Sequence, residues 1–177
     1  MESKKNTKKR TLSIRKLAMA GVLVAVAVAG SLISFPVAGS KCAPIQHMVN
    51  ICAAVFLGPV WGVGVAFCAS VIRNLTGLGS LMAFPGSMVG ALCCGLVFSK
   101  TRKYLPTYAA EVLGTGVLGG ILAYPIAIGF MGKEAALFTY VIPFLVSTLG
   151  GTVIAAILIA VLAKTHALNH MRDLLAE

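Results

Sequence analysis

The chain has 177 residues, of which 58% are hydrophobic and only 11% are charged, and its mean hydropathy is +0.93. Soluble domains usually carry about 25% charged residues, so this composition argues against an ordinary soluble fold and favours a membrane protein. At about 20 residues per span, the length allows one domain of roughly five to seven helices and leaves no room for a soluble catalytic domain.

The first 16 residues form a strongly basic tail, with seven Lys or Arg against the single acid Glu2. An apolar segment, residues 17–33, follows at once. We therefore interpret the tail as a segment that keeps the N-terminus in the cytoplasm, and not as a nucleic-acid-binding arm. A basic start, an apolar stretch and Ala27-Val28-Ala29 are also typical of a cleavable signal peptide. A retained first helix fits better, because the rest of the chain is itself predicted to be membrane-embedded.

Small residues recur in this first helix at intervals of four, at Gly21, Ala25 and Ala29. Small side chains at that spacing allow another helix to approach closely, although an Ala-rich segment also produces the pattern by chance. The spacing makes this face a candidate contact for another membrane subunit.

A polar stretch, residues 34–50, lies between two strongly apolar runs and includes the start of the second helix. Two prolines and a glycine break its first half, and Pro44 suits the first turn of a new helix. Gln46, His47 and Asn50 then lie on or near one helix face, at spacings of three and four. Since an amide inside an apolar helix needs a hydrogen-bond partner, we expect this stretch to form the mouth of a binding site.

The whole pattern predicts an all-α membrane protein with six transmembrane helices. Their approximate ranges are 17–33, 44–57, 60–74, 86–98, 107–131 and 137–163, with Pro125 expected to kink the fifth. The predicted organisation is a basic tail at 1–16, a six-helix substrate-binding domain at 17–165 and a cytoplasmic C-terminal tail at 166–177.

The distribution of Lys and Arg supports this topology. With the N-terminus inside, twelve of the fifteen basic residues fall on the inner side, as the positive-inside rule requires. Both termini are then cytoplasmic, and the predicted location is a prokaryotic inner membrane crossed several times.

The same topology gathers polar and aromatic residues at the outer end of the bundle. The candidate substrate-binding residues are Gln46, His47, Asn50, Arg73, Asn74, Ser80, Phe84, Tyr124 and Tyr140. Each also has an ordinary structural interpretation: Arg73 reaches toward lipid headgroups, and the tyrosines form part of an interfacial belt. Lys41 is expected to be solvated.

Glu111 falls about one turn into the fifth helix from the cytoplasmic side. By this topology it cannot pair with Arg73. It is expected to meet Lys100, Arg102 or Lys103, or to face a partner subunit.

The sequence gives little support to an enzyme. It has no carboxylate pair and no H-E-x-x-H, and the nearest P-loop trace, at Gly132-Lys133, has Ala127 and Glu134 where glycine and Ser/Thr belong. The five cysteines lack zinc or redox spacing and are interpreted as packing residues, so we predict neither metal nor cofactor. With no ionisable residue evident at mid-membrane, the chain is expected to borrow its energy from a partner.

Five blocks of the sequence resemble those of a known protein family. They are residues 30–50 (GSLISFPVAGSKCAPIQHMVN), 57–59 (LGP), 73–75 (RNL), 81–87 (LMAFPGS) and 110–116 (AEVLGTG). Together they resemble the ThiW family of substrate-capture (S) components of energy-coupling-factor (ECF) transporters, over about residues 12–165.

The resemblance implies an S component that captures the thiazole precursor of thiamine, 4-methyl-5-(2-hydroxyethyl)thiazole. It implies three partners, a transmembrane coupling subunit and two ATPase subunits, with the small-residue motif at Gly21 and Ala25 meeting the coupling subunit. ATP hydrolysis would rock the capture subunit so that the site tips toward the cytoplasm.

The candidate residues are compatible with such a ligand. Phe84 or Tyr124 is suited to stack on the ring, Asn50 or His47 to donate to its nitrogen, and Gln46, Asn74 or Arg73 to hold the hydroxyl. Because Glu134 is the only carboxylate expected at the outer side, the neutral thiazole is preferred to cationic thiamine. The alternatives are a self-sufficient carrier or channel for a small neutral solute, an S component for another vitamin such as thiamine, and a scaffold that binds no solute.

Overall fold

The chain begins with one long helix, α1 (Glu2–Gly30), which joins the basic tail to the first apolar segment. The computed structural model describes residues 2–37, 40–132 and 134–176, and the side chains of residues 14–37, 40–132 and 134–175. The prediction that the helix begins at residue 17 was therefore wrong. Lys and Arg are good helix formers and do not interrupt the helix. The basic side chains of residues 1–13 lie outside the described part.

A β-hairpin occupies the first half of the polar stretch. β1 (Phe35–Val37) pairs antiparallel with β2 (Ser40–Cys42), with Pro36 opposite Lys41. Proline is tolerated here because each strand of a two-stranded sheet is an edge. The all-α prediction missed these two strands. Directly after the hairpin, Pro44 begins α2 (Pro44–Phe56), as the sequence predicted.

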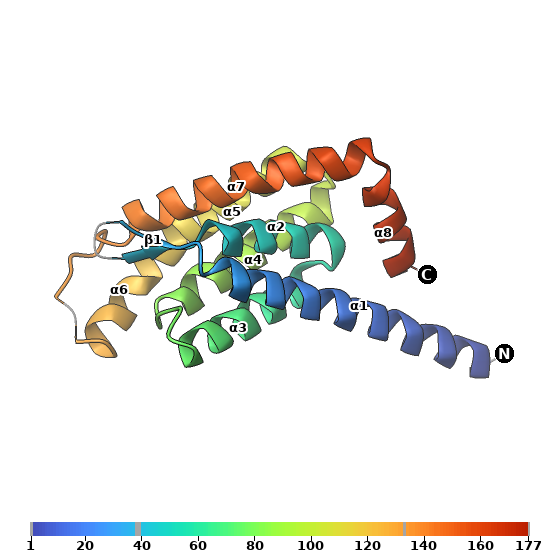
Figure 1. Ribbon diagram of the computed structural model, residues 1–177, viewed down its shortest axis with the longest axis horizontal. Coiled ribbons are helices and arrows are strands. Elements are labelled where there is room, and N and C mark those ends of the chain that lie inside the picture. The colour runs from blue at the N-terminus through green and yellow to red at the C-terminus, as the bar shows by residue number, and fades with distance from the viewer. Residues whose placement is uncertain (1, 38–39, 133, 177) are drawn as a thin grey trace.

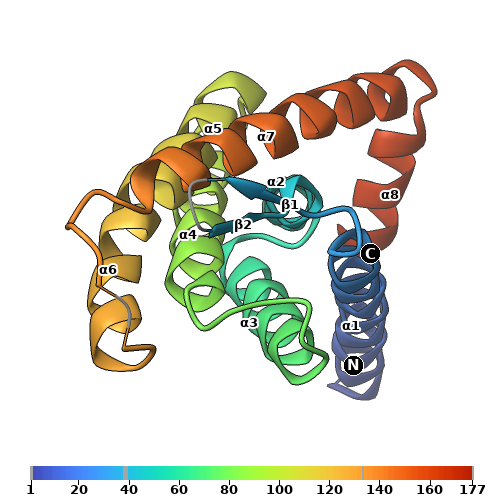
Figure 2. The same cartoon turned by 60° about the vertical axis from the view of Figure 1, so that its left-hand side comes forward.

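α2 lies at the centre of the bundle, with α1, α3, α4 and α7 packed around it (Figure 1, Figure 2). Ten of its thirteen residues are buried. Gly58, at φ 84°, turns the chain into α3 (Pro59–Leu75), and α4 (Ala83–Thr101) follows. Only glycine adopts that backbone conformation readily, which explains the tight connection between two packed helices.

The predicted fifth helix is a continuous rod of three parts, α5 (Tyr104–Glu111), the π-helix η1 (Val112–Gly119) and α6 (Gly120–Gly129). α7 (Val141–Lys164) follows, and α8 (Ala167–Ala176) folds back against α1 and α7 (Figure 1). We expected a C-terminal tail where α8 forms. It buries Leu168 and Leu175, so its apolar face accounts for its docking.

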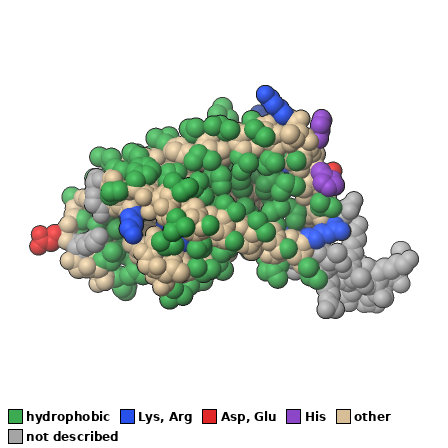
Figure 3. Space-filling view, viewed as in Figure 1, with side chains coloured by type: hydrophobic (Ala, Val, Ile, Leu, Met, Phe, Trp, Pro, Cys, Tyr) green, Lys and Arg blue, Asp and Glu red, His purple; other side chains and the backbone are tan. Residues whose placement is uncertain are grey.

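Among the described residues, three helical segments are long and apolar enough to cross a membrane, namely Ala83–Thr101, Tyr104–Gly129 and Val141–Lys164. α2 and α3 are apolar but shorter, so the structure supports a mainly helical membrane architecture without confirming six spans. Hydrophobic side chains cover the middle of the face in Figure 3, and Lys and Arg lie toward its ends. That distribution suits a protein surrounded by lipid.

Glycines allow α4 and η1 to pack almost backbone to backbone. A Cβ at Gly119 would lie 2.6 Å from the Cα of Gly86, and one at Gly114 would lie 3.2 Å from the Cα of Gly90. A π-helical turn often marks a functional site, because its wider winding re-aims side chains. Here the close approach brings Glu111, the last residue of α5, and Thr115 of η1 against α2 and α4.

Candidate functional site

A small cavity of about 40 Å³ lies at the end of the bundle where α2 begins. It is formed by β2, the first turn of α2, α3, the connection to α4, α4 itself, η1 and α7. Its lining residues are Ser40, Lys41, Ala43, Gln46, His47, Arg73, Gly79, Ser80, Ala83, Gly86, Ser87, Thr115, Phe144 and Ser147.

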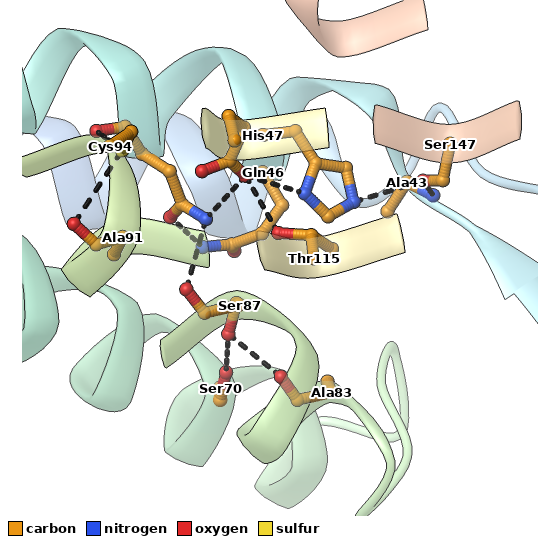
Figure 4. Close-up of polar contacts among 12 residues, drawn as sticks. Ala43, Gln46, His47, Ser70, Ala83, Ser87, Ala91, Cys94, Thr115 and Ser147 are labelled. Atoms are coloured by element: carbon orange, nitrogen blue, oxygen red, sulfur yellow. Dashed lines mark hydrogen bonds and ion pairs between the residues drawn. The ribbon is translucent and has the colours of Figure 1, made fainter. Parts of the chain in front are cut away.

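His47 connects the cavity to a buried carboxylate. Its Nδ1 lies 3.2 Å from Glu111 Oε1, and its Nε2 lies 3.1 Å from Ser147 Oγ (Figure 4). The backbone N–H of Ala43 donates to the same Ser147 hydroxyl at 2.9 Å. A neutral imidazole protonated on Nδ1 satisfies all of these contacts, because Ser147 can then donate to Nε2. Both ring nitrogens are thus engaged, and the ring is held at the cavity wall.

A chain of amides leads from the same carboxylate to Arg73. Asn50 Nδ2 donates to Glu111 Oε1 at 3.0 Å and to Ser87 O at 3.1 Å, and Gln46 Nε2 donates to Asn50 Oδ1 at 3.2 Å. Arg73 Nη1 donates to Gln46 Oε1 at 3.3 Å. Arg73 is only 4% exposed and Glu111 is fully buried. The two opposite charges are therefore joined by Gln46 and Asn50 through the protein interior.

Glu111 does not take the position that the sequence analysis gave it. Its Oε1 accepts hydrogen bonds from His47, Asn50 and Thr115, the last at 2.9 Å, and its Oε2 is buried without a partner among the described residues. The expected pairing with a basic residue of the 100–103 segment was wrong. The sequence analysis found no ionisable residue clearly at mid-membrane, and the structure adds that Glu111 is fully buried within the bundle.

The cavity separates the predicted site residues into three groups. Gln46, His47, Arg73 and Ser80 line it, and so does Lys41, whose side chain is exposed as expected. Asn50 and Asn74 stand behind the wall: Asn50 is fully buried, and Asn74 Nδ2 donates to Ser70 O and to Ser80 O, which fixes the loop before α4.

The three predicted aromatic residues lie outside the lining. Phe84 packs against Phe67, with ring centroids 5.8 Å apart, and Tyr140 is buried in a second core cluster with Met82, Ala123 and Ala127. Tyr124 also does not line the cavity. The aromatic side chain of the lining is that of Phe144, which the sequence analysis missed.

Cys42 ties the hairpin to α7 at the cavity rim. Its Sγ lies 3.1 Å from Pro143 O, and burial raises the pKa of the thiol because a thiolate there would lose its hydration. The cysteines of the described residues are all free, and no group of three or more His, Cys, Asp or Glu among those residues is placed to hold a metal ion.

The sequence model of the family described as "Thiamine-precursor transporter protein (ThiW)" matches residues 17–165, which is most of the chain. The chain belongs to the ThiW family. This confirms the resemblance of the five sequence blocks. No curated protein and no solved structure gives a match. ThiW is a family of transporters and not of enzymes, and together with the apolar helices it indicates a membrane protein.

Proposed function

We propose that this ThiW-family protein is the S component of an ECF-type importer and that it captures hydroxyethylthiazole at the outer cavity. The family match supports the substrate class, because it names a thiamine precursor. The proposed location of the binding site rests on the convergence of Gln46, His47 and Arg73 on one small cavity. The bilayer, a transmembrane coupling subunit and two ATPase subunits are the proposed partners.

The charges around the cavity favour a neutral ligand over thiamine. The charged side chains in its lining are Lys41 and Arg73, both cationic, which would repel a thiazolium ring. The prediction from sequence that Glu134 is the only carboxylate near the site was wrong, because Glu111 hydrogen-bonds to His47 of the lining. Glu111 lies close behind the wall, but His47, Asn50 and Thr115 occupy its Oε1. That oxygen is therefore not available to the ligand.

The lining offers a partner for each part of the thiazole. Phe144 takes the stacking role that we had given to Phe84 or Tyr124. Arg73 Nε has no hydrogen-bond partner among the described residues and is suited to the ligand hydroxyl. Ser147 or His47 is suited to the ring nitrogen. A ligand without these polar atoms would leave buried donors unpaired and bind poorly.

Capture requires the cavity to widen. Ligand pockets usually enclose about 300 Å³ or more, whereas a cavity of about 40 Å³ has room for only a few waters. The non-helical segments at its rim are β2 and the connection between α3 and α4, which contributes Gly79 and Ser80. These segments are the natural ones to move, because the remaining walls are packed helices.

The proposed contact with the coupling subunit is the small-residue face of α1. Gly21, Ala25 and Ala29 are all exposed, and a Cβ at Gly21 would meet no atom within 4 Å. A face of small residues left open in this way allows another helix to pack closely. In the proposed mechanism, the bundle rocks against the coupling subunit along this face and delivers the ligand to the cytoplasm.

Replacing Asn50 by alanine is expected to abolish thiazole capture while the protein still inserts into the membrane. The substitution removes the link between Gln46 and Glu111 and leaves buried groups unpaired, at a cost of about 1–3 kcal/mol for each. Equilibrium binding of labelled ligand to the purified variant measures this. Asn169→Ala, at an exposed position of α8, is the matched control. Unchanged affinity in Asn50→Ala would remove Asn50 from the site.

Replacing Gly21 or Ala25 by leucine is expected to leave ligand binding intact and to stop uptake. Both positions are exposed, so the larger side chain disturbs an intermolecular contact and not the packing of the bundle. Uptake by cells that express the whole transporter, compared with binding to the isolated variant, separates the two effects. If uptake survives both changes, the coupling contact lies elsewhere.

The deciding experiment for the ligand is binding of radiolabelled hydroxyethylthiazole to the purified protein in detergent, with unlabelled thiamine as competitor. We expect binding that thiamine does not displace. Equal competition by thiamine would refute the argument from cavity charge, and no binding would move the search to other small heterocycles.

The main alternative is an ion-coupled carrier that works alone, and the buried Glu111 favours it, because an ionisable residue within membrane helices is often a coupling site. Uptake by vesicles that contain only this protein, driven by an ion gradient, would support this alternative over the S-component proposal.

A further inference from the structure

A second and larger cavity lies at the other end of α2. Its volume is about 350 Å³, and it is enclosed by α1, the C-terminal turn of α2, the end of α4, and α8. On α2 the lining of the outer cavity ends at His47 and that of the inner cavity begins at Ala54, about 10 Å further along the helix axis. Its lining residues are Lys16, Ala54, Val55, Phe56, Leu57, Gly58, Phe98, Ser99, Arg102, Arg172, Asp173 and Leu175. The outer site does not use any of them.

The charged lining of this inner cavity is mainly basic. Lys16 lies in α1, Arg102 follows the last residue of α4, and Arg172 lies in α8. Asp173, whose side chain is exposed, is the acid among the lining residues. Cations also suit the C-terminal end of α2, where backbone carbonyls are left without helical partners. That explanation does not account for Arg172, since its Nε and Nη2 atoms are buried and make no hydrogen bond among the described residues.

Aromatic rings hold the guanidinium of Arg172 in place without using its donors. The guanidinium carbon lies 5.1 Å from the ring centroid of Phe98 and 5.7 Å from that of Tyr104, and Arg102 lies 5.8 Å from the Phe98 centroid. Cation–π contacts engage the face of the guanidinium, whereas its N–H groups point outward in the plane. Two guanidinium groups gathered on one ring, with free N–H donors, match the geometry that binds phosphate oxygens.

Apolar side chains lie beside these cations, both in the cavity wall and on α1. The cavity wall includes Val55, Leu57 and Leu175, and Ile14 and Leu17, beside Lys16 on α1, are 58% and 62% exposed. A free phosphate ion would use only the basic groups. A phospholipid would use both, with its phosphate in the cavity and its acyl chains along α1.

We propose that the inner cavity binds the phosphate of an anionic phospholipid headgroup, with Arg172 and Arg102 as its principal ligands and Lys16 completing the site. By the predicted topology this end of the bundle faces the cytoplasm, where Lys and Arg at the membrane surface meet anionic lipid. The arrangement also gives α8 a role: it carries Arg172 and closes the cavity, and Arg15 Nη1 ties it to α1 through a 2.9 Å bond to Leu174 O.

The test is native mass spectrometry of the full chain. The purified protein is mixed in detergent with equal amounts of phosphatidylglycerol and phosphatidylcholine, and the lipid that stays bound after release from detergent is measured. We expect selective retention of phosphatidylglycerol. Arg172→Gln should weaken it about tenfold, as the loss of a charge-assisted contact does. Lys100→Gln removes the same charge from an exposed position of α4 outside the cavity and should have no effect. Because Arg172 also packs on aromatic rings, Arg102→Gln, at an exposed side chain, serves as a second variant.

Inorganic phosphate, added as a competitor, separates the two sources of the ligand. If phosphate displaces the lipid only at a large excess, the headgroup assignment stands. If it binds as well as the lipid and with the same dependence on Arg172, the phosphate chemistry holds and the lipid assignment is overturned. Equal retention of the two lipids, or loss of assembly with partner subunits in these variants without loss of lipid, would overturn the proposal.

Discussion

Replacing Glu111 by alanine is expected to abolish thiazole binding and to lower the free energy of unfolding by about 3–5 kcal/mol. The carboxylate oxygen Oε1 is the shared acceptor for His47, Asn50 and Thr115. Without it, these buried donors lose their partner, and the chain of hydrogen bonds that runs through Asn50 and Gln46 to the buried Arg73 loses its end point. Thermal unfolding in detergent and equilibrium ligand binding measure the two effects.

Glu111→Gln separates charge from hydrogen bonding at the same position. The amide keeps an acceptor oxygen for part of the network, so this variant should fold, but it should bind ligand more weakly than the parent protein because a neutral amide oxygen is a weaker acceptor for the donors of His47, Asn50 and Thr115. Glu134→Gln is the matched control, since Glu134 is exposed in the connection before α7. Parental affinity and melting temperature in Glu111→Ala would refute the role given to this carboxylate.

The helices themselves could largely be predicted from the sequence, because their boundaries have local causes. Pro44 and Gly58-Pro59 mark the start of α2 and the turn into α3, and both appear within a residue of the predicted positions. The basic tail was predicted to lie outside the first helix because charge was used as a boundary signal, whereas charge does not end a helix. Local chemistry thus located the elements but not every end.

The position of Glu111 could not be obtained in the same way. Counting residues gives the depth of a side chain along its own helix, but not how far a neighbouring helix is shifted or tilted. α2 is short and buried, so its first two turns reach the level of Glu111. A signal was nevertheless present: Thr107, Glu111 and Thr115, spaced by four, form a polar face on an apolar span, and all are buried. That face predicts a polar partner inside the bundle.

The prediction that three aromatic residues line the site was wrong for a related reason. The sequence placed Phe84, Tyr124 and Tyr140 near helix ends on the outer side. The position of a residue along the helix axis, however, does not determine the direction in which its side chain points. Tyr140 faces α6 and Met82, and Phe84 faces Phe67 of α3. Phe144, one turn after Tyr140, carries the ring that lines the cavity.

Replacing Gly90 by alanine is expected to weaken thiazole binding by at least about tenfold and to destabilise the fold by about 1–3 kcal/mol, the usual cost of overpacking. An added Cβ would lie 2.8 Å and 2.9 Å from the two carboxylate oxygens of Glu111 and would collide with the hydroxyl of Thr115. The end of a glutamate side chain normally moves aside at little cost. Here it cannot do so without breaking its hydrogen bonds to His47 and Asn50.

Gly64→Ala is the matched control for this experiment. Gly64 lies in α3, is exposed, and its added Cβ would meet no atom within 4 Å. Because alanine favours a helix over glycine, this variant should bind ligand normally and gain about 0.5–1 kcal/mol of stability. Thermal unfolding should therefore shift in opposite directions in the two variants, and ligand binding should weaken only in Gly90→Ala. Parental binding in Gly90→Ala would mean that the Glu111 carboxylate is free to shift, and hence that the cavity does not depend on its fixed position.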